Sequence, residues 1–511
     1  MEEQITQKQA SNTKFVVTGL LLGILLAAMD NTIVATAMPT IVGDLGGFDK
    51  FVWVTSAYMV ATMAGMPIFG KLSDMYGRKR FFIGGLLLFL TGSMLCGTAS
   101  SIEQLSVYRA IQGIGGGALM PIAFTIMYDI FPAEKRGKMT GLFGAVFGTS
   151  SVFGPLLGAY ITDYINWHWV FYINIPLGII SLFLITKYYK ESLQYSKQKI
   201  DWTGAVTLII GIVCLMFALE LGGKQYAWDS SVIVSLFATF AIMMIIFFFI
   251  ERKVEEPIIS FHLFRKRLFA ASQGVAFLYG ATFIICTVYI PLFIQGVLGG
   301  SAANAGLILT PMMVGSVIGS QIGGQLSTRT SYRNIMMISG LFFILGMYLL
   351  STLTVDTSRT MITVFMILAG FGVGFSFSVL SMASIHNLSM RERGSATSTN
   401  SFFRSLGMTL GVTIFGTIQN HVFTDQLKSV FPPELAKMAP KGGDTSFLLS
   451  PNATEKIPPQ ILDGIKHALA TSIADTFLWA LIPAALSIVC ILLMGKERLI
   501  VPTNKKQKQV S

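Results

Sequence analysis

Long apolar stretches alternate with short polar segments along nearly the whole chain. Each stretch is a continuous apolar run and not an alternation of apolar and polar positions. A helix needs about 20 such residues to cross roughly 30 Å of hydrocarbon, and a helix pairs its backbone groups within its own segment. The pattern therefore predicts an all-α integral membrane protein with fourteen transmembrane helices. The predicted spans are residues 15–37, 51–70, 81–99, 105–128, 138–161, 168–187, 202–221, 232–250, 268–292, 302–324, 334–353, 359–383, 395–420 and 472–495.

The composition supports lipid as the solvent for most of the chain. The 511 residues are 53% hydrophobic and only 12% charged, with a mean hydropathy of +0.65, whereas soluble domains carry about 25% charged residues. A net charge of +11 raises the question of a nucleic-acid partner. However, the basic residues form short runs between apolar stretches, as in 71–80, 133–138 and 264–267. Such placement indicates membrane orientation and no nucleic-acid binding.

The distribution of Lys and Arg predicts the orientation in the membrane. An even number of spans places both termini on one side. With the N-terminus in the cytoplasm, the inner segments hold 27 Lys and Arg residues and the outer loops hold 8, of which five lie in the long loop 421–470. Because cytoplasmic loops retain Lys and Arg, we expect a multi-pass protein with both termini cytoplasmic.

The chain contains an internal repeat at an offset of 257 residues. Two six-helix halves related by duplication, separated by two extra helices, account for fourteen spans. A cavity between such halves is the common plan of secondary transporters. The matching segments are 133–160 with 390–417, 112–117 with 369–374 and, more weakly, 70–79 with 324–333. The expected organisation is a cytoplasmic tail 1–14, an N-terminal half 15–190, two inserted helices within 191–257, a C-terminal half 258–495 that includes the extracellular loop 421–470, and a cytoplasmic tail 496–511.

Asp30 is the first candidate for chemistry, because it lies about two-thirds of the way across the first span. A charged carboxyl at that depth costs roughly 3 kcal/mol, so it should face protein or a water-filled cavity. Gly19, Gly23 and Ala27 share its helical face and allow a neighbouring helix to come close. We interpret Asp30 as a proton-coupling group; the alternative is a structural Asp that a neighbouring helix satisfies.

Four further polar residues fall within or at the ends of spans. Arg109 enters the fourth span from the outer side and shares a face with Gln112, which makes Arg109 the predicted partner or modulator of Asp30. The alternative is an Arg that extends to the outer headgroups. Arg404, ten residues into the thirteenth span, either lines the pathway or extends inward. Glu220, near the outer end of the seventh span, either contacts a cationic substrate or lies at the interface.

The turn GKLSDMYGRKR joins the second and third spans on the predicted cytoplasmic side. Gly70 and Gly77 permit a tight turn. Asp74 can accept hydrogen bonds from a helix N-terminus or from Arg78, and Lys79 belongs to the basic run that keeps the loop inside. The fixed spacing is more specific than that of an ordinary basic loop and indicates a conformational role.

Small residues form a stripe along the fifth span. Such a stripe lets two helices pack backbone to backbone, and a Gly-Pro pair provides a kink where packing can shift. Plain tight packing is the alternative. The stripe residues are Gly137, Gly141, Gly144, Gly148, Ser151, Pro155 and Gly158, with Gly154 preceding the proline.

Sites of other kinds are not expected. The four cysteines lie in apolar segments without a CxxC pair or a His cluster, which argues against disulfides and a metal site. The glycine run 112–117 lacks a following Lys-Ser/Thr, so an ATP site is unsupported. No catalytic constellation is visible. The interpretation is therefore a protein that is not an enzyme and has no cofactor beyond protons as the coupling ion.

Together these motifs resemble the major facilitator superfamily, and within it the fourteen-helix drug:proton antiporters. The elements that carry the resemblance are AAMDNTIVATAMP, GKLSDMYGRKR, YRAIQGIGGG, GTSSVFGPLLGA and WHWVFYINIPLG. The chain departs from the family pattern at Ala35, where Asn is usual, at Ala159, where Gly is usual, and at His168, where Arg is usual. The departures at Ala159 and His168 leave the substrate range open.

The resemblance, which is nearest to multidrug resistance transporters of Bacillus-like bacteria, implies a function. It implies a major facilitator fold and proton-driven efflux of lipophilic, often cationic compounds across the bacterial plasma membrane. The expected partners are the lipid bilayer and small lipophilic substrates, without nucleic acid or ATP, and the protein is expected to work as a monomer. Alternatives are a dedicated exporter of one metabolite, antibiotic or lipid, a nutrient symporter, and a membrane sensor without transport.

Overall fold

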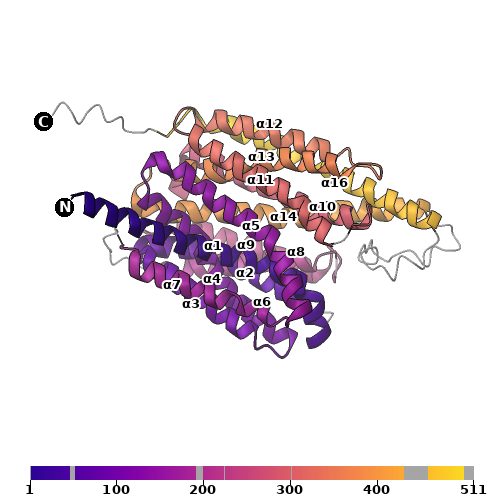
Figure 1. Ribbon diagram of the computed structural model, residues 1–511, viewed down its shortest axis with the longest axis horizontal. Coiled ribbons are helices and arrows are strands. Elements are labelled where there is room, and N and C mark those ends of the chain that lie inside the picture. Colours follow the sequence, from indigo (N-terminus) through magenta and orange to yellow (C-terminus); the bar gives the residue numbers. More distant parts are fainter. Residues whose placement is uncertain are drawn as a thin grey trace.

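A bundle of long helices makes up the computed structural model, which describes residues 2–46, 52–191, 200–223, 225–300, 302–430 and 459–499. Within those ranges the regular structure is helical, apart from one isolated bridge between Gly222 and Tyr226. Figure 1 shows the helices running side by side along the long axis. Their bounds are α1 (Glu2–Leu45), α2 (Val52–Tyr76), α3 (Arg78–Cys96), α4 (Ile102–Ile130), α5 (Ala133–Tyr164), α6 (Trp169–Tyr172), α7 (Asn174–Tyr188), α8 (Trp202–Leu221), α9 (Ser231–Glu251), α10 (Arg267–Gly296), α11 (Ala302–Leu326), α12 (Tyr332–Leu350), α13 (Arg359–Ser384), α14 (Arg393–Val430) and α16 (Pro459–Leu493).

A helix occupies each of the fourteen predicted spans. The sixth span is divided at Ile173 into α6 and α7. Among the described residues, twelve helical segments are long and apolar enough to cross a membrane, with α6 and α7 taken as one. The two long helices outside that set are α2 and α5, whose glycines Gly70, Gly137 and Gly158 lie against other helices. The predicted all-α membrane fold is confirmed.

The predicted outer loop 421–470 is partly helical. Helix α14 continues to Val430 and α16 begins at Pro459, while residues 431–458 lie outside the described residues. Side chains one turn apart stabilise the extensions: Lys428 binds Asp425 at 2.7 Å, and His467 lies 3.5 Å from Asp463. Pairs at this spacing favour helix. A hydropathy pattern locates the apolar part of a helix and misses such polar continuations.

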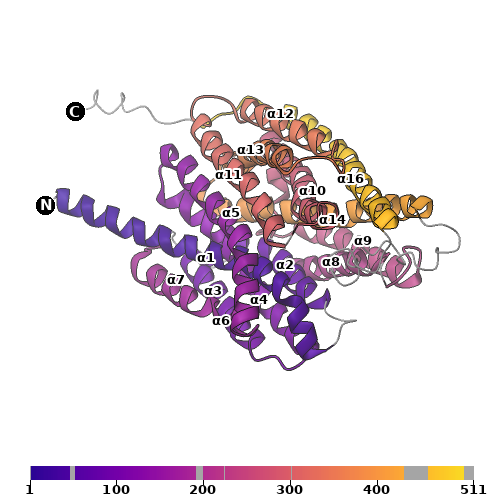
Figure 2. The same cartoon turned by 45° about the vertical axis from the view of Figure 1, so that its right-hand side comes forward.

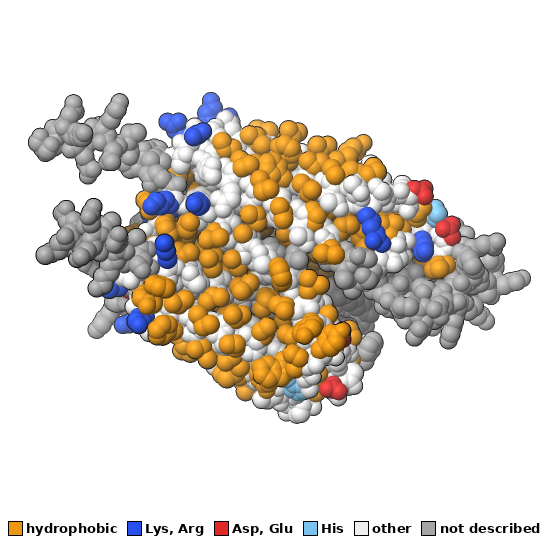
Figure 3. Space-filling view, in the orientation of Figure 1, with side chains coloured by type: hydrophobic (Ala, Val, Ile, Leu, Met, Phe, Trp, Pro, Cys, Tyr) orange, Lys and Arg blue, Asp and Glu red, His pale blue; other side chains and the backbone are white. Residues whose placement is uncertain are grey.

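The start of α1 and the described residues that follow α16 lie at the same end of the bundle (Figure 1). We name this end the terminal face: α1 begins there, and the chain after α16 binds there, since Leu499 N donates to Ser327 O at 3.0 Å. Figure 3 shows Lys and Arg side chains gathered at this end and a broad apolar band along the rest of the visible surface. This distribution is typical of a protein that crosses a bilayer.

The internal repeat is visible in the packing of α4 and α13. A Cβ on Gly113 of α4 would lie 2.5 Å from Tyr58 O of α2, and one on Gly370 of α13 would lie 2.7 Å from the carbonyl carbon of Met312 of α11. The two glycines are 257 residues apart, the offset found in the sequence. Equivalent glycines therefore allow equivalent close helix contacts in both halves.

The inserted hairpin of α8 and α9 packs beside α2 and α14, as Figure 2 shows. One apolar cluster joins Val60 and Ala64 of α2, Leu208 and Ile212 of α8, and Phe402 of α14. Because α2 belongs to the N-terminal half and α14 to the C-terminal half, the hairpin contacts both halves.

Candidate functional site

The Asp30 carboxylate is buried in the interior of the N-terminal half and forms an ion pair with Arg109 of α4. Gln112, one turn further along α4, donates from Nε2 to Asp30 Oδ1 at 2.7 Å and accepts from Arg109 Nη1 at 2.7 Å. The pairing of Asp30 with Arg109 that the sequence predicts is therefore present. Arg109 is fully buried and does not extend to headgroups.

Three residues that the sequence reasoning missed complete this cluster. Asn174, the first residue of α7, donates from Nδ2 to Asp30 Oδ1 at 3.2 Å and to Ser93 Oγ of α3 at 2.9 Å. The Tyr58 ring of α2 lies beneath the Arg109 guanidinium, with 4.1 Å between the ring centroid and Cζ. Asn174 is a polar residue inside the WHWVFYINIPLG element, which was the available signal.

The buried ion pair between Asp30 and Arg109 would respond to a change in the charge of Asp30. Asp30 and Arg109 neutralise each other in a buried site, where an unpaired charge costs several kcal/mol. Adding a proton to Asp30 would leave the Arg109 cation without its counter-charge. The pair must therefore separate, or water must reach it, when the carboxyl is protonated. The cluster draws on α1, α2, α3, α4 and α7, so such a change would alter how α1 packs in its own half.

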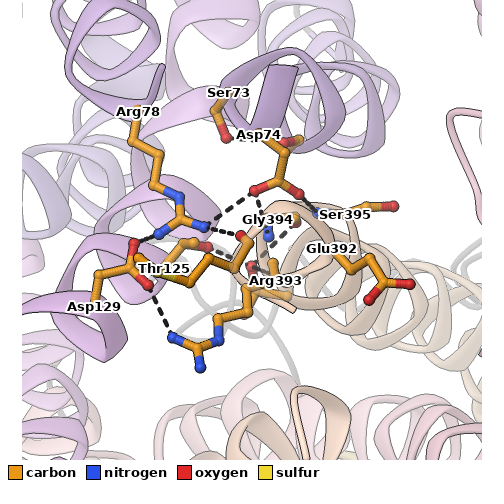
Figure 4. Close-up of polar contacts among 12 residues, drawn as sticks. Ser73, Asp74, Arg78, Thr125, Asp129, Glu392, Arg393, Gly394 and Ser395 are labelled. Carbon is orange, nitrogen blue, oxygen red and sulfur yellow. Dashed lines mark hydrogen bonds and ion pairs between the residues drawn. The ribbon is translucent and has the colours of Figure 1, made fainter. Parts of the chain in front are cut away.

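A second polar cluster lies on the terminal face (Figure 4). Arg78 Nη2 contacts Asp74 Oδ1 at 3.2 Å and Met390 O at 2.5 Å, and the same guanidinium pairs with Asp129. Arg393 Nη1 lies 3.1 Å from Asp129 Oδ1. The acids come from α2 and α4, whereas Met390 and Arg393 precede and begin α14, so the cluster joins the two halves.

Asp74 binds the N-terminus of α14. Its Oδ1 accepts from Gly394 N at 2.9 Å and its Oδ2 accepts from Ser395 N at 2.7 Å. The first N–H groups of a helix have no partner within the helix and carry partial positive charge, which favours an anion there. The sequence predicted that Asp74 would accept from a helix N-terminus or from Arg78; it does both, and the helix belongs to the other half.

The remaining residues of this turn have separate roles. Gly77 has φ of 104°, which favours glycine between α2 and α3. A Cβ on Gly70 would lie 2.8 Å from Gly394 O, so Gly70 allows α2 to approach α14. Lys79 lies apart from the Asp74 cluster, because its Nζ donates to the Tyr189 carbonyl at 2.5 Å at the end of α7.

The small-residue stripe of α5 serves two interfaces and not one. Toward the terminal face, Gly137 lies against Gly324 of α11, where an added Cβ would be 2.6 Å from the Gly324 Cα. Further along, a Cβ on Gly158 would lie 2.6 Å from Ile33 O of α1, and one on Gly154 would also meet α1. The stripe therefore packs α5 against the other half at one end and against α1 at the other.

For two members of the predicted α5 motif, Gly148 and Pro155, the described part of the structure gives no close contact with another helix that supports a role. Gly148 lies in a part of α5 whose contacts are outside the described residues. Helix α5 continues without a break through Pro155. A proline inside a helix removes one backbone hydrogen bond, which is the usual origin of a kink.

Replacing Gly158 by Ala is expected to destabilise the protein by about 1–3 kcal/mol, the usual cost of overpacking. The added methyl group would meet the Ile33 carbonyl and the Thr36 hydroxyl of α1. Thermal unfolding of the purified protein in detergent measures the effect. Gly84→Ala is the matched control, because a Cβ there meets nothing within 4 Å. Equal melting temperatures for the two variants would contradict close α1–α5 packing.

Arg404 and Glu220 are not brought to the Asp30 cluster. Arg404 of α14 points toward α13, where its Cζ lies 4.5 Å from the Phe377 ring centroid and Nη2 lies 3.4 Å from Ser376 O. No acidic partner of Arg404 is found in the described ranges. Glu220 lies in the last turn of α8, in the inserted hairpin. The same ranges contain no group of three or more His, Cys, Asp or Glu side chains placed to hold a metal ion.

The pattern of helices and motifs matches a known family. The model of the Major Facilitator Superfamily matches residues 20–412. The chain belongs to this superfamily. Its members are transporters built on a common membrane fold, and the predicted family is therefore confirmed.

Two curated relatives are similar over nearly the full length. Multidrug resistance protein 3 of Bacillus subtilis (strain 168) is 63% identical over 497 residues, which is 96% of this chain and 97% of the relative. Multidrug transporter protein MdtP of the same organism is 38% identical over 485 residues, which is 92% of this chain and 90% of the relative.

Solved structures of the superfamily share the fold. The human organic anion transporter MFSD10 (TETRAN) superposes with a TM-score of 0.59 at 15% identity, covering 92% of this chain and 99% of that one. A double Trp mutant of XylE superposes with a TM-score of 0.60 at 12% identity, covering 96% of this chain and 98% of that one. At this level of identity the likeness establishes the fold alone.

Proposed function

We propose that the protein is a proton-coupled antiporter that exports small lipophilic, cationic compounds across a bacterial plasma membrane. The observation that carries the proposal is the buried Asp30 carboxylate, whose charge Arg109 neutralises. Ionisable groups inside membrane segments commonly mark proton or ion pathways. The names of the two Bacillus relatives support drug efflux as the activity.

The proposed orientation places the terminal face in the cytoplasm, in keeping with its Lys and Arg side chains (Figure 3). In this arrangement the Asp74 cluster closes the cytoplasmic side, because it ties α2 to the start of α14. The glycine contact of α5 with α11 closes the same side. The conformation then has a closed cytoplasmic side, and in this proposal the proton reaches Asp30 from the outside.

Exchange follows from linkage between the two ligands. Protonation of Asp30 disturbs the pair with Arg109, and opening of the cytoplasmic side admits substrate. If the proton and the substrate favour different conformations, each lowers the affinity for the other by the same factor. The electrical part of the proton gradient supplies about 2.3 kcal/mol per charge per 100 mV. This cycle requires no ATP and no second copy, since both halves lie in one chain.

Uptake into everted membrane vesicles tests this function. Vesicles with an acidic lumen and the protein in their membrane should accumulate a fluorescent lipophilic cation, and a protonophore should abolish the uptake. A panel of chemically different dyes separates a multidrug pump from a dedicated exporter, which would accept one compound. If no dye shows gradient-dependent uptake, the multidrug proposal is wrong, and a membrane sensor without transport becomes the better interpretation.

A further inference from the structure

Two acidic side chains lie buried together at the terminal-face end of the inserted hairpin. Asp201 precedes the first residue of α8, and Glu251 is the last residue of α9. Asp201 is 6% exposed and Glu251 is 3% exposed. Neither belongs to the Asp30 cluster or to the Asp74 cluster. Buried carboxylates are rare unless a cation or hydrogen-bond donors compensate them.

Only one oxygen of each carboxyl group has a hydrogen-bond donor. Asp201 Oδ1 accepts from Gly204 N at 2.8 Å, which caps α8, and from the Thr203 hydroxyl at 2.8 Å. Glu251 Oε1 accepts from Ile258 N at 3.1 Å. Asp201 Oδ2 and Glu251 Oε2 are buried and have no hydrogen-bond partner among the described residues.

Gly204 holds open the space between the two groups. A Cβ at this position would lie 3.0 Å from Glu251 Oε1 and would also strike Asp201 Oδ2. Both carboxyl groups therefore border the same small volume beside the Gly204 Cα. A larger residue at position 204 would collide with both carboxyl groups.

The neighbouring positive charge does not neutralise the two carboxyl groups of Asp201 and Glu251. Lys71 of α2 is the cation that acts on Glu251, but its Nζ binds Glu256 at 2.5 Å. Helix α14 contributes an uncharged group, the Ser395 hydroxyl, which donates to Ile258 O at 3.1 Å. With Lys71 committed to Glu256, two ionised carboxylates would leave two negative charges close together in a buried site. Two carboxylates sharing such a site cannot readily both ionise.

We propose that Asp201 and Glu251 share one proton, which makes the base of the inserted hairpin a proton-binding site separate from Asp30. The O–H of one carboxyl group donates to the free oxygen of the other. This single hydrogen bond satisfies both unpaired oxygens and reduces the charge of the pair by one. A proton is the fitting ligand, because the cluster has only two carboxylates and too few donors for a metal ion.

The shared proton would also hold the cytoplasmic side closed. Residues 252–260 leave the hairpin and bind both halves: Glu256 pairs with Lys71 of α2, and Ile258 binds Ser395 of α14 as well as Glu251. Loss of the proton makes Asp201 and Glu251 repel each other. The repulsion displaces Glu251 and so disturbs the hydrogen bond that its Oε1 accepts from Ile258 N. Proton release at this site therefore loosens the contact of the hairpin with α2 and α14.

Infrared difference spectroscopy on the full chain in lipid nanodiscs tests the shared proton. Spectra recorded between neutral and alkaline buffer, a range in which solvent-exposed Asp and Glu side chains stay ionised, should contain the C=O stretching band of a protonated carboxylic acid. The band should disappear in Glu251→Gln, since the amide can still donate to Asp201 but cannot titrate. It should persist in Glu256→Gln, which removes a neighbouring acid and leaves the pair intact. Repeating the series in an Asp30→Asn background removes the contribution of Asp30 and keeps this test independent of the proposed transport mechanism.

The pH dependence of thermal unfolding provides a second measurement. The folded protein holds a proton that the unfolded chain releases at neutral pH, so stability should fall as the pH rises through the release of that proton. Glu251→Gln and Asp201→Asn should both remove this fall, and Glu256→Gln should retain it. A carboxylic acid band that survives in both Glu251→Gln and Asp201→Asn would overturn the proposal, as would identical pH profiles for wild type and Glu251→Gln.

Discussion

Replacing Asp30 by Asn is expected to reduce gradient-driven dye uptake in everted vesicles to the background level. Asn has nearly the same shape and can keep hydrogen bonds with Gln112 and Asn174, but it cannot take up or release a proton. The substitution also leaves Arg109 without its counter-charge, and breaking a buried pair in this way costs about 3–5 kcal/mol. Uptake must therefore be normalised to the amount of folded protein in the membrane.

Two further variants separate coupling from folding. In the double variant Asp30→Asn/Arg109→Gln neither charge remains, so stability should recover in part while uptake stays at background. Asp44→Asn is the matched control in the same helix, because Asp44 accepts a hydrogen bond from Trp167 Nε1 at 2.8 Å outside the Asp30 cluster. It should retain uptake. Gradient-dependent uptake by Asp30→Asn at the wild-type level would contradict the assignment of Asp30 as the coupling group.

Asp74→Asn is expected to open the bundle at the terminal face, which we propose is the cytoplasmic side. Asp74 accepts hydrogen bonds from the Arg78 guanidinium and from two backbone N–H groups in the first turn of α14, those of Gly394 and Ser395. Losing the charge of a buried, paired carboxylate costs about 3–5 kcal/mol, which shifts a two-state equilibrium roughly a hundredfold or more. The closed state should lose this stabilisation, because the contact joins the two halves.

Thiol labelling from the cytoplasmic side measures this opening. Ser398 of α14 is fully buried against Gly70, so a Ser398→Cys probe in a chain without its native cysteines should react slowly with a membrane-impermeant reagent. Adding Asp74→Asn should raise the labelling rate markedly. Asp163→Asn, which changes an exposed acid at the far end of α5, should leave it unchanged. Equal rates for the two variants would rule out the Asp74 contact as a cytoplasmic lock.

Much of the fold could be predicted because a long apolar run in lipid must form a helix to pair its own backbone groups. Every predicted span holds a helix, and the offset of 257 residues aligns Gly113 with Gly370, which the structure packs in equivalent ways. The ion pair of Asp30 with Arg109 was also predictable. Both residues are costly in the membrane unless paired, and topology places them at a similar depth.

Other features were missed because they depend on neighbours that the sequence does not place. Asn174 and Tyr58 join the Asp30 cluster only through the packing of α7 and α2 against α1 and α4. Lys79 was grouped with the Asp74 turn by proximity in sequence, yet it binds the end of α7. The polar extensions of α14 and α16 carry no hydropathy signal, so the sequence did not show that both helices continue into the loop 421–470.

The sequence by itself determined the membrane class, the helical spans, the duplicated halves and the main candidate acid. These follow from local physics, since each apolar segment must pair its own backbone groups and each buried charge needs a partner. Only the tertiary structure decided that Asp74 binds the start of α14, that the hairpin contacts both halves, and that Asp201 and Glu251 are both buried beside Gly204. Those contacts join segments from separate parts of the chain, and their energy depends on side chains that meet only after the helices have packed.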